Sequence, residues 1–289
     1  MPGSMRTAPS TTDRHALYEA AVQCVDADLD FVERVYRRRN GTRPVTLRED
    51  FCGTAALAAA WAARRSENRA VGVDLHAATL AWGRRHRLRP IGDAASRVRL
   101  VRADVRRAER HPADVAVALN FSFCVFRRRG ELAEYFGAVR RSLRPGGLFV
   151  LDMFGGQDGT SVLVESKRKG GTVDPDGRRV APFTYLWEQV SFNPVDRRIR
   201  CAIHFRLRGG RIQRNAFTYD WRAWTLPELT EVLLEAGFAE ADVYAQGWDE
   251  ADQDGDGKFR KTDRFEDQSS WVVYVVAARD RVSRVATRR

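Results

Sequence analysis

The chain has 289 residues, of which 44% are hydrophobic, so we expect a packed core in one large domain with an insertion or in two small domains. It contains no run of eighteen apolar residues and no charged-then-apolar signal at its N-terminus, which predicts a cytoplasmic protein that does not enter a membrane. The four cysteines form no Cys-x-x-Cys pair, so zinc and disulfide bonds are not favoured and no metal site is predicted.

The net charge of +11 points to nucleic acid as one class of partner. However, nearly all of the cations are Arg, they are spread along the whole chain, and no Lys-rich block or basic–aromatic repeat occurs. A solvated basic surface is therefore the favoured interpretation, and a nucleic-acid partner stays open as an alternative. The oligomeric state is not predicted by the sequence.

Two helices are predicted before the first strand. Residues 13–25 place Leu17, Ala21 and Val25 at helical spacing, and a second helix starts near Asp28. Because both helices precede the sheet in the chain, we expect residues 1–42 to form a helical cap that packs across it.

The most informative segment is an apolar extended run, residues 45–50, that ends in two acids. Glu49 and Asp50 end this run, a turn through Gly53 and Thr54 follows, and an Ala-rich helix begins there, with Thr54 as its expected cap. This order is typical of the first strand-to-helix turn of an open α/β sheet, where ligands bind beyond the carboxyl ends of the strands. The Glu49 carboxylate would repel a pyrophosphate but suits an ammonium group.

The following strands repeat this arrangement. Residues 70–74 form a short apolar run closed by Asp74, which is placed to accept hydrogen bonds from ribose hydroxyls. Further strands are predicted at residues 98–101, at residues 113–119 and, after a helix, at residues 148–153. The strand at 113–119 ends in Asn120-Phe121-Ser122 at the expected ligand crevice.

Three motifs resemble those of the class I S-adenosylmethionine-dependent methyltransferases: Glu49-Asp50-Phe51-Cys52-Gly53-Thr54-Ala55, Val73-Asp74-Leu75 and Arg102-Ala103-Asp104-Val105. The resemblance covers residues 43–153 well, although Phe51 and Ala55 stand where the family usually has glycines. It implies a doubly wound, mostly parallel, seven-stranded sheet, with S-adenosylmethionine as cofactor and S-adenosylhomocysteine as product. The turn would hold the methionine end, Asp74 the ribose and Asp104 the adenine amino group.

The resemblance also implies that the N-terminal cap closes over the cofactor. The residues expected to bind the cofactor are Tyr18, Gln23, Glu49, Phe51, Gly53, Thr54, Asp74, Leu75, Asp104, Val105 and Asn120.

The pattern changes after the fifth strand. Residues 183–192, 199–207 and 212–221 alternate with period two, which predicts an antiparallel three-stranded insertion within residues 154–224 that supplies the substrate pocket. Thr225 and Glu228 then form a capping box at the start of another helix. The methyltransferase core is expected at residues 43–153 and 225–278, with strands at 241–245 and 271–278, and the basic tail at 279–289.

The expected reaction is in-line methyl transfer to a small polar molecule, with an amine as the candidate acceptor. Trp187 and Glu188 together suit a cation through cation–π attraction and charge pairing. His204 lies on the face of its strand opposite its apolar neighbours, which makes it a candidate base near neutral pH. The catalytic candidates are Asn120, His204 and Tyr219, and the substrate candidates are Phe121, Ser122, Trp187, Glu188 and Asp220. For the aromatic residues packing is an equal alternative, and a solvent-facing His204 fits as well.

Other functions stay open. An RNA or DNA methyltransferase would use the basic surface, but Asn120-Phe121-Ser122-Phe123 lacks the two prolines of enzymes that methylate base amines. A nicotinamide oxidoreductase fits poorly, because its Gly-x-Gly-x-x-Gly turn is absent. A non-catalytic S-adenosylmethionine-binding protein is a further alternative. Residues 252–257 match the start of a calcium loop, but an acidic surface loop is favoured.

Overall fold

The computed structural model describes residues 13–108, 111–173, 177, 179–249, 254–266 and 268–281. Five parallel strands form one side of the main sheet: β1 (Thr46–Asp50), β2 (Arg69–Asp74), β3 (Val98–Arg102), β4 (Ala113–Ala118) and β5 (Leu143–Gly155). Antiparallel strands extend the sheet beyond β5: β14 (Trp271–Ala278), β12 (Glu240–Asp249) and β13 (Asp254–Thr262). Within the described residues the strand order is β13-β12-β14-β5-β4-β1-β2-β3.

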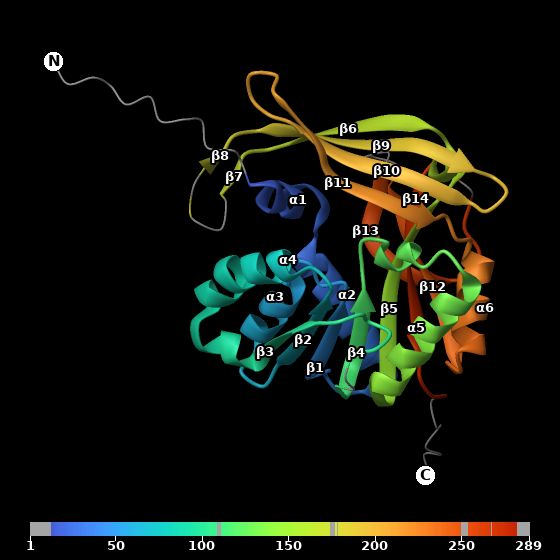
Figure 1. Ribbon diagram of the computed structural model, residues 1–289. Helices are drawn as coiled ribbons and strands as arrows, with labels where there is room; N and C mark the ends of the chain where they lie inside the picture. Colours follow the sequence, from blue (N-terminus) through green and yellow to red (C-terminus); the bar gives the residue numbers. More distant parts are fainter. Residues whose placement is uncertain are drawn as a thin grey trace, which may run out of the picture.

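Helices cover both faces of this sheet (Figure 1). One face carries α2 (Val25–Asn40), α3 (Ala56–Arg64) and α4 (Ala77–Gly83), and the other carries α5 (Arg129–Ser142) and α6 (Leu226–Glu235). Every residue of β4 is buried, as expected for a central strand that is covered on both faces. The predicted doubly wound α/β fold is confirmed, with β13 as an eighth strand that the sequence analysis did not predict.

A second, antiparallel sheet lies across the carboxyl ends of the central strands (Figure 1). Its order is β11-β10-β9-β6, formed by β6 (Leu163–Lys169), β9 (Phe183–Asn193), β10 (Arg198–Arg206) and β11 (Ile212–Arg222). A short pair, β7 (Thr172–Val173) and β8 (Arg179–Val180), lies between β6 and β9 in the chain. The sequence predicted three of these strands and missed β6, whose charged residues show little alternation.

The two N-terminal helices have different places in the fold. The helix α1 (Arg14–Val22) packs beneath the antiparallel sheet, with Leu17 in a buried cluster beside Phe183 and Phe205. The helix α2 instead packs on the main sheet through Leu29 and Phe31, in one cluster with core residues of β1, β4 and β5. The helix α1 thus packs against the antiparallel sheet, and α2 packs mainly against the main sheet.

Two local predictions need correction. Thr54 does not cap the helix after the first strand, because α3 begins at Ala56 behind a left-handed Ala55 and the Thr54 hydroxyl donates to Glu19. The segment from Asp254 onward pairs with β12 as a strand instead of forming a loop.

Residues 250–253, where the calcium-loop match begins, lie outside the described residues. Among the described residues, no helix is both long and apolar enough to span a membrane.

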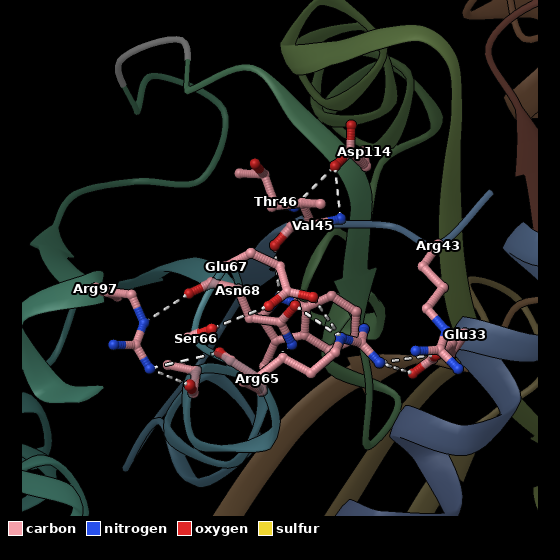
Figure 2. A network of polar contacts seen from close by, with 12 residues as sticks. Glu33, Arg43, Val45, Thr46, Arg65, Ser66, Glu67, Asn68, Arg97 and Asp114 are labelled. Atoms are coloured by element: carbon pink, nitrogen blue, oxygen red, sulfur yellow. Dashed lines mark hydrogen bonds and ion pairs between the residues drawn. The ribbon is translucent and has the colours of Figure 1, made fainter.

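The amino ends of the central strands are fixed by internal polar contacts (Figure 2). Asp114 accepts the backbone N–H groups of Val45 and Thr46, both at 2.8 Å. The buried Asn68 donates to the Trp61 carbonyl at 2.7 Å. These contacts tie the amino end of β1 to β4 and the turn before β2 to α3.

Candidate functional site

A cavity of about 500 Å³, here called the main cavity, opens at the carboxyl ends of β1, β2 and β4, beneath α1 and β11. It brings together residues that are up to two hundred positions apart in the chain. The sequence-predicted residues that line it are Tyr18, Gln23, Glu49, Phe51, Gly53, Thr54, Asp74, Asn120, Ser122, Tyr219 and Asp220.

The turn after β1 forms the floor of the main cavity. Phe51, Gly53 and Ala55 all have positive φ, at 55°, 52° and 58°, so the chain winds tightly around this point. The Gly53 N–H donates to Asp74 Oδ2 at 2.8 Å, and the His76 N–H donates to Asp74 Oδ1 at 2.8 Å. These two bonds fix the Asp74 carboxylate, whose remaining lone pairs are free to accept hydroxyl groups.

Glu49 is a buried carboxylate without a cationic partner among the contacts of the described residues. Its side chain is only 8% exposed and accepts one hydrogen bond, from the Ala58 N–H at 2.9 Å. Burial raises the pKa of Glu49 to about 8, the Ala58 N–H opposes this rise, and the negative charges of Asp74 and Asp28 add to it. A cation beside Glu49 would relieve this unfavourable environment.

The neighbouring acid is neutralised within the protein. Arg48 lies 2.8 Å from Asp50 in a buried ion pair, and the Tyr135 hydroxyl donates to the other carboxylate oxygen at 3.0 Å. Of the two acids that end β1, Glu49 is thus the one left to complement a bound cation.

The helix α1 closes one side of the main cavity. Its Tyr18 lines the cavity beside Tyr219 of β11, and its Glu19 accepts from the Thr54 hydroxyl at 2.6 Å and from Arg87 at 3.0 Å. Gln23, at the end of the helix, has a buried Oε1 atom without a hydrogen-bond partner. The cap thus presents an unused acceptor at the cavity wall.

A second cavity of about 190 Å³, here called the side cavity, adjoins the main cavity beneath the antiparallel sheet. The two cavities share Tyr18, Asn120, Tyr219 and Trp221. Its other walls include the aromatic rings of Phe121, Phe154, Tyr185 and Trp187, and its acids are Asp158 and Glu165. No Lys, Arg or His stands among its lining residues in the described part of the chain.

The sequence-predicted substrate residues divide between these cavities and the outer surface. Phe121 and Trp187 line the side cavity, and Ser122 lines the main cavity. Asp220 also lines the main cavity, but its carboxylate is held in ion pairs by Arg198 and Arg127.

His204 and Glu188 lie outside both cavities. They pair with each other, with His204 Nε2 at 2.7 Å from Glu188 Oε2, and His204 Nδ1 accepts the Asn215 N–H at 2.8 Å. Their chain neighbours Ile203 and Trp187 line the side cavity. Because successive side chains of a strand point to opposite faces, His204 and Glu188 point away from it. His204 is also buried, in contrast to the solvent-facing alternative.

Three cofactor candidates at the sheet edge also lie outside the main cavity. Asp104 is paired with Arg106 at 2.6 Å, which holds the pKa of Asp104 below its usual range. Leu75 is 58% exposed, and Val105 is buried with its carbonyl accepting from Arg48. For Asp104 to accept an adenine amino group, it would have to share its carboxylate with Arg106.

Sequence analysis missed several residues of these cavities. Asp28 of α2 lines the main cavity and accepts the Tyr274 hydroxyl, and Asp152 of β5 lies directly behind Asn120. Asp152 carried a signal, since it is a lone acid within an apolar strand. Tyr185 could have been found two residues before Trp187 on the same strand face, whereas Glu165 lies on the unpredicted β6.

The main cavity fits S-adenosylmethionine chemically. The uncompensated Glu49 carboxylate and the unpartnered Gln23 Oε1 suit an ammonium group, and Asp74 suits a pair of hydroxyls. The positive sulfonium also suits a cavity walled by Glu49, Asp74 and Asp28. These residues would hold the cofactor, which supplies a reactive methyl group on a positively charged sulfur.

Residues 52–149 match the family model of a methyltransferase domain. This segment carries Gly53, Asp74 and Asn120 of the main cavity. No curated protein matches the chain.

Solved structures show the same fold. One is an S-adenosylmethionine-dependent methyltransferase from Clostridium acetobutylicum, with a TM-score of 0.63 and 16% identity over 91% of this chain and 96% of that chain. Another is an amino pentose methyltransferase from Micromonospora echinaspora, with a TM-score of 0.62 and 18% identity over 92% of this chain and 96% of that chain. A third is a sugar N-methyltransferase from a Streptoalloteichus species, with a TM-score of 0.63 and 19% identity over 97% of this chain and 99% of that chain. At these identities the likeness establishes the fold alone.

Proposed function

From the premise that this chain is a class I S-adenosylmethionine-dependent methyltransferase, we propose that its acceptor is the amino group of a small polar molecule. The observation that carries this proposal is the side cavity. It adjoins the main cavity, it is walled by aromatic rings and two acids, and its described lining has no cationic side chain in a protein of net charge +11.

The chemistry of these walls favours an amine over an anionic or purely neutral acceptor. Aromatic faces attract cations by about 0.5–2 kcal/mol when water is excluded. Trp187, Tyr219 and Trp221 form a connected group, with ring centroids 4.3 to 6.1 Å apart. The carboxylates of Asp158 and Glu165 add negative charge at the same cavity. An acceptor with an ammonium form would therefore be drawn into the side cavity.

Two of the similar structures support the choice of acceptor class. One is an amino pentose methyltransferase and the other is a sugar N-methyltransferase. The side cavity is of a size for such a molecule rather than for a polymer.

Methyl transfer to an amine asks the protein mainly to align the reactants and exclude water. We assign Glu49 and Gln23 to the ammonium end of the cofactor, and Asp74 to its ribose. Asn120 and the Tyr18–Tyr219 pair stand where the cavities meet, so they would orient the acceptor nitrogen.

The protonation states of these groups suit that role. Burial raises the pKa of Tyr18 to about 12, so its hydroxyl stays neutral and can donate or accept a hydrogen bond at the junction. An acceptor that arrives as an ammonium ion must lose one proton before its nitrogen bonds to the methyl carbon. Glu165 lines the side cavity and is also exposed, which gives that proton a route to solvent.

Matched pairs of acceptors test the proposal. The protein would be incubated with S-adenosylmethionine and small cyclic polyols that carry one amino group, each beside the same polyol with a hydroxyl in its place, and product mass would be measured. We expect methylation of the amines and none of the hydroxyl analogues.

Methylation of the hydroxyl analogues, of tRNA or of duplex DNA instead would overturn the proposal. Cofactor binding without turnover of any acceptor would identify a non-catalytic binding protein. Trp187→Ala tests the side cavity separately from the main cavity, because Trp187 lines only the side cavity.

A further inference from the structure

The turn after β4 holds two consecutive residues in an unfavourable backbone conformation. Asn120 has a φ of 58° and Phe121 a φ of 59°, both in the left-handed region. This region is uncommon for any residue other than glycine, and for a bulky residue such as phenylalanine it is a clear outlier. Such conformations persist where the surrounding structure enforces them, and they cluster at functional sites.

Asp152 of β5 enforces this conformation. Its Oδ2 accepts the Asn120 N–H at 2.9 Å, and its Oδ1 accepts the Phe121 N–H at 2.8 Å. The Ser122 hydroxyl closes the turn by donating to the Leu119 carbonyl at 2.6 Å. Only a carboxylate offers an acceptor to both N–H groups, because an amide side chain would turn a donor toward one of them.

The consequence of this clamp is the placement of Asn120. Asn120 lines both the main and the side cavity, whereas Asp152 lines neither. Phe121 is held by the same clamp, and its ring packs 4.8 Å from the ring of Phe154 in the side-cavity wall. Without the clamp, the strain of the turn would be released by rotating these two residues away from the junction.

We propose that Asp152 is a positioning residue for methyl transfer, acting through the backbone of Asn120 and Phe121 to set the junction of the two cavities. This inference rests on the proposed function for its kinetic consequences. The clamp itself is independent of the acceptor.

The charges around Asp152 are consistent with this role. Burial raises its pKa to about 7, the two N–H groups oppose the rise, and the negative charge of Asp28 on α2 adds to it. The other titratable groups that interact with Asp152 are Tyr18 on α1, Cys124 after the turn and Tyr274 on β14. None of these is a cation, so a positive ligand at the junction would favour the ionised carboxylate that holds both N–H groups.

The chain contains a matched control at the opposite end of the sheet. Asp114 also accepts two consecutive backbone N–H groups, those of Val45 and Thr46, both at 2.8 Å (Figure 2). This second clamp lies at the amino end of β1, away from both cavities. Asp114 differs in geometry, because its Oδ2 accepts both N–H groups and its Oδ1 lies 3.1 Å from Arg144 Nη1. Asp114→Asn is therefore the control for replacing a carboxylate that accepts backbone N–H groups at a place far from the junction.

The experiment compares these two variants in the full-length protein. For each, we would measure kcat and KM with an amine acceptor, the Kd of S-adenosylhomocysteine by calorimetry, the melting temperature, and hydrogen exchange at the amides of residues 120 and 121. We expect Asp152→Asn to lower kcat by about 10- to 100-fold, the effect of a misplacement on the order of 1 Å. Its Kd should change less than about threefold, since the contacts of Glu49 and Asp74 remain.

Asp152→Asn should also speed exchange at the amides of Asn120 and Phe121, because the acceptor of one of them is lost. Asp114→Asn, which weakens the pairing with Arg144, should lower the melting temperature but leave kcat and the exchange at these amides unchanged. Equal kinetic effects in the two variants, or an unchanged kcat in Asp152→Asn, would overturn the inference.

A glycine background separates positioning from a merely structural role. Glycine adopts positive φ without penalty, so Phe121→Gly should make the turn less dependent on its clamp. The fold-loss in kcat caused by Asp152→Asn should then be several-fold smaller in the Phe121→Gly background than in the natural chain. An undiminished loss would show that Asp152 does not act through this backbone.

Failure of the proposed function would look different. If the natural chain methylates no amine, the proposed acceptor class is wrong, but hydrogen exchange still tests the clamp. Unchanged exchange at residues 120 and 121 in Asp152→Asn would then refute the positioning role without reference to turnover.

Discussion

Glu49 gives the sharpest test of how the main cavity binds a cation. With a pKa of about 8, the Glu49 carboxyl is about 1% ionised at pH 6 and about 9% ionised at pH 7. A cationic ligand selects the ionised form, so the affinity for S-adenosylhomocysteine, whose amino-acid ammonium stays protonated over this range, should rise about ninefold between pH 6 and 7. That change corresponds to about 1.3 kcal/mol of binding free energy.

Isothermal titration calorimetry at several pH values, in buffers of different ionisation enthalpy, measures this coupling. The natural chain should release about 0.9 proton per bound ligand at pH 7, because Glu49 is mostly protonated before binding. Glu49→Gln should bind more weakly at pH 7 and show no rise in affinity between pH 6 and 7. Glu228→Gln is the control, since Glu228 belongs to the capping box of α6 and should leave the pH profile unchanged.

The same carboxyl should affect stability in the absence of ligand. The folded state retains the Glu49 proton up to about pH 8, whereas the ordinary value of the group is 4.5. Between these values the folded state binds more protons than the unfolded state, so this group makes the free energy of unfolding fall as pH rises. Glu49→Gln should therefore raise the melting temperature more at pH 8 than at pH 5. A natural chain with flat pH profiles for both affinity and stability would refute the assignment of Glu49.

Three further predictions concern individual side chains. Asp74→Ala should weaken S-adenosylhomocysteine binding by roughly 1–3 kcal/mol, because buried donors lose their acceptor; an unchanged Kd by calorimetry would contradict the ribose contact. Trp187→Ala should raise KM for the amine by about 3- to 30-fold, as expected for loss of a cation–π contact, with little change in cofactor Kd; an unchanged KM would remove Trp187 from the acceptor site. His204→Ala should lower stability by about 1–3 kcal/mol through the unpaired Asn215 N–H but keep kcat within about threefold; a hundredfold loss of kcat with retained folding would restore His204 as the base.

The α/β architecture and the acids at the strand ends could be predicted from local sequence patterns. Apolar runs that end in Glu49 and Asp74, a Gly53 turn and an Ala-rich helix predict parallel strands with ligand groups at one edge. This prediction succeeds because the spacing of apolar residues and the residue that ends an apolar run can both be read from a short stretch of the chain. The family resemblance of the same motifs then implied the cofactor, which the match of residues 52–149 supports.

The faces on which those residues lie and the partners that they contact depend on contacts between distant parts of the chain. Trp187 and Glu188 are neighbours in sequence, but adjacent strand residues point to opposite faces, so only Trp187 reaches the side cavity. His204 on β10 pairs with Glu188 on the neighbouring strand β9, and the register between these strands cannot be predicted from alternation alone. The unpredicted β6 brings Glu165 to the same cavity, because its charged sequence gains its strand conformation from pairing with β9.

The ionisation of the acids at the site also depends on tertiary structure. Glu49 and Asp50 are consecutive acids of similar chemistry, yet Arg48 and Tyr135 neutralise Asp50 while Glu49 is left buried with other acids nearby. The clamp of Asp152 on the turn after β4 likewise depends on the pairing of β4 with β5. The strength of a buried charge depends on the dielectric and the charges around it, and these are set by residues far apart in the chain.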